Sequence, residues 1–198
     1  GESAFLGCDA LTSAQIPEGV RSIGGTAFVG CKNLRAVVIP STVESVGYRA
    51  FEGCTSLQRI EIPPEIETLP CHTFHGCASL VEIKLPEYLE SIRDEAFADC
   101  INLANIKIPD NVREIGRGTF RNCRSIERIS ISPRVSLIMR ELFAGCSNLK
   151  EVTMPDIIVK IGCDSFKGCE KLSSIVIPDG VVVIESRAFK GCLGLTNV

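Results

Sequence analysis

The sequence predicts a solenoid, an elongated stack of similar coils with one coil for every 23 residues. Two observations carry this prediction: all nine phenylalanines, and nine of the eleven cysteines, recur at that interval. A fixed period of about 20–29 residues is typical of chains that form one solenoid turn per repeat. The phenylalanines are Phe5, Phe28, Phe51, Phe74, Phe97, Phe120, Phe143, Phe166 and Phe189, and the cysteines are Cys8, Cys31, Cys54, Cys77, Cys100, Cys123, Cys146, Cys169 and Cys192.

Composition favours one domain over residues 1–198 with a large core, since 45% of the chain is apolar. The apolar runs are too short for a transmembrane helix, so we expect no membrane insertion. A net charge of −3, no Trp and no basic run argue against nucleic-acid binding. The chain starts and ends inside repeats, without the polar caps that solenoid ends need. We therefore expect a segment of a longer protein that lacks its caps; the segment shows no signal peptide.

Each repeat begins with a strand of the pattern L-x-x-V-x-I, followed by Pro. Residues two apart on a strand share a face, so the last two apolar positions point inward. β-Branched residues suit this pleated surface, and Pro ends the strand because it lacks the amide that a ladder needs. The inward residues are Val37, Ile60, Ile83, Ile106, Ile129, Val152 and Ile175, and, two positions on, Ile39, Ile62, Leu85, Ile108, Ile131, Met154 and Ile177.

A second short extended piece, anchored by Val43 and Val46 in one repeat, leads to the segment x-A-F-x-G-C. We expect this segment to be a short helical turn, with Phe filling the centre of the coil. Its Gly is expected to end the turn in a left-handed conformation. Asp99 and Asn122 replace that Gly in two repeats, and both residue types tolerate the same geometry.

These motifs resemble the BspA-like leucine-rich repeat family over the whole chain. The resemblance implies an α/β leucine-rich-repeat solenoid of about 8.6 repeats (198/23), with a parallel β-sheet on its concave face. It also implies an extracellular or cell-surface location and a non-enzymatic role, since several members are adhesins, but it carries over no site residue. The segments that match best are Ile39-Pro40, Val43, Val46-Gly47, Ala50-Phe51-Glu52-Gly53-Cys54 and Leu57, and Ile177-Pro178-Asp179-Gly180-Val181, Ile184 and Ala188-Phe189-Lys190-Gly191-Cys192.

The in-phase cysteines are predicted to form a buried ladder of free thiols. Stacked side chains point the same way, about 5 Å apart, whereas a disulfide needs converging Cβ atoms about 3.8 Å apart. A free Cys packs there as a small hydrophobe. Cys71 and Cys163 lie out of phase in a polar column, so we expect these two thiols to be partly exposed.

The only two histidines share one turn with an off-register cysteine, in Cys71-His72-Thr73-Phe74-His75. Cys71, His72 and His75 are candidate zinc ligands. No fourth ligand is evident and the spacing departs from the usual zinc motifs, so variable surface residues of a turn are the alternative. No catalytic base oriented by a third group is apparent, and we expect neither a catalytic residue nor a cofactor.

The outward residues of the first strand form the candidate binding surface, because sheets of this repeat type line the face where partners bind. Equivalent residues of successive repeats stack, which places opposite charges side by side, an arrangement that stabilises sheets. The face is therefore either a self-paired, solvated surface or a mixed-charge patch that binds a protein. The absence of aromatic residues in these columns argues against sugar recognition. The candidate residues are Arg59, Glu61, Glu82, Lys84, Asn105, Lys107 and Arg128.

Two further surfaces stand out. Glu44, Glu67 and Glu90 stack in one column, where their like charges repel one another. Either calcium or a basic partner relieves this repulsion, or the three carboxylates are simply hydrated. The C-terminal third is apolar where upstream repeats are polar, which indicates self-association or docking to other parts of a parent protein. The apolar residues are Leu137, Met139, Ile157, Val159, Val182 and Val183.

The sequence leaves three functional interpretations. The first is a non-enzymatic protein-interaction or adhesion module of a cell-surface or secreted protein, with a host or neighbouring-cell protein as partner. The second is a structural spacer, or a repeat element that assembles through uncapped ends or through the apolar C-terminal third. The third is a metal- or thiol-dependent binding protein built on Cys71, His72, His75 and Cys163.

Overall fold

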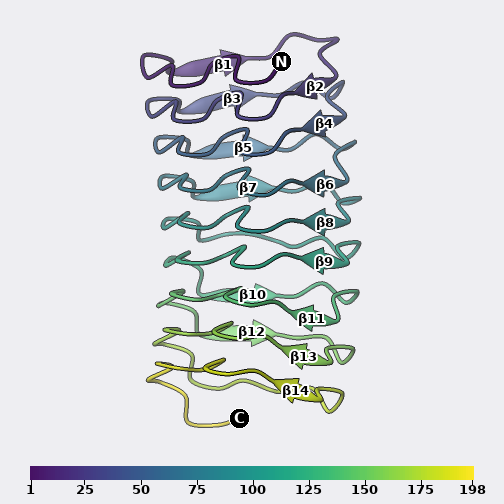
Figure 1. Ribbon diagram of the computed structural model, residues 1–198, viewed down its shortest axis with the longest axis vertical. Helices are drawn as coiled ribbons and strands as arrows, with labels where there is room; N and C mark the ends of the chain where they lie inside the picture. The colour runs from purple at the N-terminus through teal and green to yellow at the C-terminus, as the bar shows by residue number, and fades with distance from the viewer.

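The computed structural model describes residues 1–198 and shows the predicted solenoid (Figure 1). Successive coils stack along the long axis, and the two termini lie at opposite ends of the stack. All strand pairings are parallel and join equivalent residues of neighbouring repeats: Arg59 pairs with Glu82, and Leu69 with Ile92. One coil per repeat is therefore confirmed.

The first column of strands comes from the L-x-x-V-x-I segments, and we call its outer surface the strand face. Each strand is three residues long, with its central residue inward and both neighbours exposed, except that Ala14 of β1 is only partly buried. The ladder runs through β1, β3, β5 and β7 and resumes at β10 and β12; between these parts only an isolated bridge joins Glu82 to Asn105. The strands are β1 (Ser13–Gln15), β3 (Ala36–Val38), β5 (Arg59–Glu61), β7 (Glu82–Lys84), β10 (Arg128–Ser130) and β12 (Glu151–Thr153).

The second column of strands lies further along each coil, where Figure 1 shows a parallel row of short arrows. Each strand has two residues and pairs with its equivalent one coil away, in three separate ladders. These strands are β2 (Ser22–Ile23), β4 (Ser45–Val46), β6 (Thr68–Leu69), β8 (Ser91–Ile92), β9 (Glu114–Ile115), β11 (Leu137–Ile138), β13 (Lys160–Ile161) and β14 (Val183–Ile184).

The segment around each Phe is a series of tight turns, and the helical turn expected from the sequence does not form. Some amides bond within the coil, as Cys31 N donates to Phe28 O at 3.1 Å. The amides that alternate with these donate to the next coil, as Phe28 N donates to Ala50 O at 2.8 Å. A helix needs consecutive right-handed residues and i→i−4 bonds. Here Thr26 is left-handed, with φ 56°, and intercoil bonds replace the helical ones.

The predicted left-handed Gly position is confirmed. Gly53 has φ 70°, and the two replacements, Asp99 and Asn122, have φ 62° and 61°. These values lie in the region where Gly is unstrained and where Asp and Asn are the best-tolerated substitutes. The sequence therefore predicted one of the two left-handed positions in each coil.

The interior is one continuous apolar column built from the phenylalanine rings. Neighbouring rings stack with their centroids between 5.0 and 5.8 Å apart. Phe74, Phe97 and Phe120 are 0% exposed, whereas Phe5, in the first coil, is 45% exposed. Stacking each coil on the next therefore removes the ring from water, as expected for a structure in which coils contact only their neighbours.

The in-phase cysteines run beside the rings, and their predicted burial is confirmed from Cys31 to Cys169. The prediction was wrong for Cys8, which is exposed, and for Cys192, which is partly exposed, because each lies in an end coil that a neighbour covers on one side only. Each Sγ donates to the carbonyl of the Phe one coil earlier; for Cys54 Sγ to Phe28 O the distance is 3.1 Å. The Phe28 carbonyl also accepts a hydrogen bond from the amide of Cys31. The carbonyl oxygen therefore uses both of its lone pairs, one for the amide and one for the thiol. Burial raises the pKa of Cys54 to about 12 and that of Cys146 to about 12. These thiols therefore stay protonated at neutral pH and act as weak hydrogen-bond donors.

Candidate functional site

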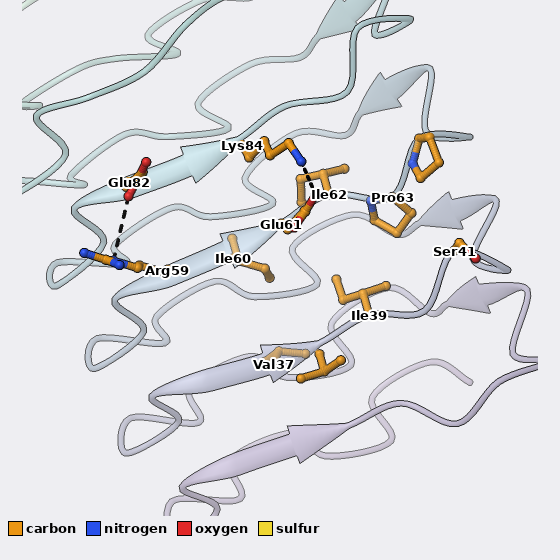
Figure 2. A pocket seen from close by; sticks show the side chains of 12 residues that line it. Val37, Ile39, Ser41, Arg59, Ile60, Glu61, Ile62, Pro63, Glu82 and Lys84 are labelled. Atoms are coloured by element: carbon orange, nitrogen blue, oxygen red, sulfur yellow. Dashed lines mark hydrogen bonds and ion pairs between the residues drawn. The ribbon is translucent and has the colours of Figure 1, made fainter.

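The seven candidate residues gather on the strand face, and we call them the strand-face patch. They line two adjoining open hollows of about 490 and 850 Å³. Figure 2 shows the first hollow, where Glu61 and Lys84 meet beside Ile62 and Pro63, and Arg59 and Glu82 meet at the other end of β5 and β7. The patch comprises Arg59, Glu61, Glu82, Lys84, Asn105, Lys107 and Arg128.

The charges on β5 and β7 pair across the ladder, as the register predicts (Figure 2). Arg59 Nε lies 3.8 Å from Glu82 Oε2, and Lys84 Nζ donates to Glu61 Oε1 at 2.5 Å. That hydrogen bond raises the pKa of Lys84. More than half of each of these side chains is exposed, and exposed pairs contribute about 0–1 kcal/mol. A partner can therefore replace them at little energetic cost.

The middle of the patch lies where the ladder is interrupted. Asn105 forms only the isolated bridge to Glu82, and the residues that follow it form no strand. Lys107 is 83% exposed, with its Nζ 4.0 Å from a Glu87 carboxylate. At the far side, Arg128 Nη1 donates to Glu151 Oε2 at 2.8 Å. The patch thus changes from exposed charge pairs at β5 and β7 to a cation at Lys107 whose carboxylate partner lies 4.0 Å away.

Tyr88 is a residue of this surface that sequence reasoning missed. It is 72% exposed and lines the larger hollow beside Lys84 and Lys107. The strand columns contain no aromatic residue, whereas Tyr88 lies in the loop two residues after Pro86. A Tyr in that loop column is itself a signal, because the equivalent position is polar or Gly in most other repeats. The hollow therefore offers one aromatic ring to a ligand, although the strand columns offer none.

The acidic column is bounded by arginines at both ends. Arg21 pairs with Glu44, and Arg113 Nη2 lies 3.7 Å from Glu90 Oε1. Both arginines occupy the same column as the glutamates, one coil before and one coil after them. The two outer carboxylates are therefore compensated, which leaves Glu67 between them; binding of calcium or of a basic partner here stays a prediction.

The two histidines lie together on the turn that carries Phe74. Their ring centroids are 5.4 Å apart, and donor atoms of His72, His75 and Glu95 all lie within 4.8 Å of one another. Cys71, which the sequence suggested as the third ligand, is not part of this group. Glu95 takes its place because it stacks directly on His72 from the next coil. The pKa of His72 is lowered, chiefly by burial, so its ring is neutral at pH 7.

The off-register thiols are partly buried, as predicted for Cys71 and Cys163. Cys163 Sγ donates to Asp164 Oδ2 at 3.2 Å, and Arg187 Nη2 bonds the same carboxylate oxygen at 2.8 Å. The hydrogen bonds from Cys163 and Arg187 hold the pKa of Asp164 low, against the opposing effect of burial. This thiol is engaged in a surface network with a carboxylate and an arginine.

The apolar residues of the C-terminal third are exposed, with Met139 half-buried. Ile157 is 48% exposed and Val182 is 80% exposed. Leu137, Val159 and Val183 are between 40% and 44% exposed. None of the elements in the structure is a helix of the length and apolarity needed to cross a membrane.

Comparison with known proteins identifies the family of this chain. The model of the BspA type leucine-rich repeat region matches residues 1–123 and 67–196. A leucine-rich repeat protein of Treponema pallidum is 34% identical, with TM-score 0.75, over 82% of this chain and 78% of its own. A leucine-rich cell surface protein of Faecalibacterium prausnitzii is 32% identical, with TM-score 0.65, over 98% of this chain and 61% of its own.

A leucine-rich repeat protein of Eubacterium ventriosum shares the fold alone, at 18% identity and TM-score 0.54 over 92% of this chain and 83% of its own. No curated protein sequence matches the chain. The family model covers nearly every residue, and the matched segments are the coils described above. The chain therefore belongs to the BspA-type leucine-rich repeat family.

Proposed function

We propose that this chain is a non-enzymatic protein-interaction module of a secreted or cell-surface protein, and that it binds its partner through the strand-face patch. The observation that carries this proposal is the pair of adjoining hollows lined by all seven residues of the patch. Leucine-rich repeat proteins are typically interaction modules, and the Faecalibacterium prausnitzii relative is a cell surface protein.

The chemistry of the patch suits a protein partner. Tyr and Arg are enriched at binding hot spots, and here Tyr88 and Arg128 line the same hollow. The labile pairs of β5 and β7 present both signs of charge, which favours a partner of complementary mixed charge. The periodic Phe and Cys residues of the inner coils are sealed in the core, which leaves the variable surface residues to make specific contacts.

Reversing four charges of the patch is expected to abolish binding of the partner. The variant combines Arg59→Glu, Glu61→Lys, Lys84→Glu and Lys107→Glu. The wild-type chain is used to capture proteins from extracts of mucosal cells and neighbouring bacteria, and the affinity of the captured protein is then measured by biolayer interferometry. Loss of a hot-spot cluster weakens affinity by more than about 30-fold.

A matched control carries Glu90→Lys, Arg113→Glu, Lys150→Glu and Lys160→Glu, which change net charge equally but lie outside the patch. This variant should bind like the wild type. Equal affinity of the patch variant and the wild type would refute binding through the strand face. Equal weakening by both variants would show that net charge alone drives association.

Self-association is a second candidate function, favoured by the exposed apolar residues of the C-terminal third. Replacing Ile157, Val159 and Val182 with Ser should leave a monomer at every concentration if this surface joins copies of the chain. Light scattering after size-exclusion chromatography measures the mass over a hundredfold range of concentration. A wild-type chain that stays monomeric throughout would exclude the assembly role.

A further inference from the structure

We propose that His72, His75 and Glu95 bind a divalent transition-metal ion of the Zn²⁺ class across two adjacent coils. One nitrogen from each ring and one carboxylate oxygen lie within 4.8 Å of one another. Donor atoms on a tetrahedral ion with bonds of about 2.0–2.2 Å lie about 3.4 Å apart, so small side-chain rotations bring these three atoms into range of one ion. Two imidazoles and a carboxylate are a known protein donor set for zinc, with water in the fourth position. The site lies on the Phe turn and is independent of the strand-face patch.

The backbone brings these donors together. His72 occupies the left-handed position of its turn, with φ 58°, and His75 follows three residues later. Glu95 holds the equivalent left-handed position one coil on, with φ 53°, so its side chain leaves the stack beside that of His72. Intercoil hydrogen bonds fix both turns: His72 N donates to Asp94 O at 3.0 Å, and Phe74 N to Ala96 O at 2.8 Å.

One donor atom has no hydrogen-bond partner. His72 Nδ1 is shielded from water yet makes no hydrogen bond, and the nearest Glu95 oxygen is 3.9 Å away. A buried polar atom without a partner is destabilising, and native structures rarely leave one without a role. A metal ion placed between His72 Nδ1 and the Glu95 carboxylate would give this nitrogen a partner.

The surroundings match those of a metal-bound histidine. Both ring nitrogens of His75 face carboxylates, with Asp99 Oδ2 at 3.1 Å from Nε2 and Glu52 Oε1 at 3.4 Å from Nδ1. When one nitrogen binds the ion, the other donates its proton to a carboxylate, which fixes the tautomer and raises the basicity of the ligand.

Two arginines form ion pairs with the three carboxylates around the site. Arg49 Nε lies 2.9 Å from Glu52 Oε2. Arg121 Nη2 lies 2.6 Å from Glu95 Oε2 and 3.8 Å from Asp99 Oδ2. Arg121 can therefore keep Asp99 as its partner when the Glu95 carboxylate turns toward the ion. Nitrogen donors favour Zn²⁺, Co²⁺, Ni²⁺ or Cu²⁺ over Ca²⁺ and Mg²⁺, which prefer all-oxygen sets.

Calorimetric titration of the metal-free full chain with ZnCl2 tests the site. We expect one ion per chain, and more than about 10-fold weaker binding in each of His72→Asn, His75→Gln and Glu95→Gln, since even outer partners of such sites contribute 10–100-fold. Asn suits the left-handed backbone at position 72, so this variant keeps its turn. The control is Glu141→Gln, at the position equivalent to Glu95 two coils further on, and it should bind like the wild type.

Cobalt substitution separates this site from the thiols. Co²⁺ bound by two imidazoles and a carboxylate shows d–d bands without a thiolate charge-transfer band, and Cys71→Ser should leave the spectrum unchanged. Sub-stoichiometric Zn²⁺ uptake, binding that survives both His72→Asn and Glu95→Gln, or a thiolate charge-transfer band that disappears in Cys71→Ser would each overturn the proposal.

Discussion

Replacing Phe97 with Ala is expected to lower the free energy of unfolding by about 3–5 kcal/mol, the range for deleting a large buried side chain. The Phe97 ring is 0% exposed, and its centroid lies 5.6 Å from that of Phe74 and 5.8 Å from that of Phe120. The strand ladders fix the spacing of the coils, so the neighbouring rings cannot close the cavity. Equilibrium unfolding in urea, followed by circular dichroism, measures the loss.

Phe5→Ala is the matched control for this experiment. The Phe5 ring is 45% exposed and stacks on one ring only, that of Phe28, at 5.0 Å. Its loss should destabilise the chain by less than half as much, because less apolar surface returns to water and no enclosed cavity forms. If the two variants were destabilised equally, the rings would not form a core that each added coil completes.

The repeat period made most of the fold predictable. Phe and Cys return to the same angular position in every coil, and a column that tolerates only those residue types is an interior column. The left-handed position was visible because Gly fills it in most repeats and Asp99 and Asn122 fill it in two. The cross-strand contact of Glu61 with Lys84 followed directly from the 23-residue register.

The second left-handed position was not predictable from residue type in most coils, since Gly fills it only once, at Gly118 with φ 58°. It holds Thr26, Arg49, His72 and Glu95 in successive coils, and none of these marks a positive φ as Gly does. The apolar pattern around Phe therefore resembled a short helix. What decides the conformation is the set of amides that donate to the next coil, and these depend on stacking and not on local propensity.

The histidine cluster likewise depends on a contact between coils that local sequence does not reveal. The sequence points to Cys71, His72 and His75 because the three residues share one turn. The third donor, Glu95, comes from the neighbouring coil, one period of 23 residues after His72. In a solenoid, sites form across coils, so the informative distance is the repeat period as well as the local spacing.

The second large effect is expected in thiol reactivity. Four thiols, those of Cys8, Cys71, Cys163 and Cys192, are exposed or partly so, and the other seven are buried. The thiolate is the nucleophile, and burial raises the pKa of Cys54 to about 12, so a buried thiol can react only after its coil opens. An opening free energy of about 3 kcal/mol slows labelling by more than about 100-fold.

The rates should also vary along the stack. A solenoid frays from its ends, so the in-phase thiols of the middle coils, Cys100 and Cys123, are expected to react most slowly. Cys31 and Cys169 lie nearer the ends and should react sooner. Peptide mapping after timed exposure to N-ethylmaleimide at neutral pH resolves each residue.

The periodic residues of the inner coils form a sealed interior, and we propose that binding belongs to the variable surface. Intact-mass counting of alkylated thiols tests this most directly. It should give four fast-reacting groups in the native chain and eleven after unfolding without reductant. Rapid labelling of the seven interior thiols in the native chain, or fewer than eleven groups after unfolding, would contradict it.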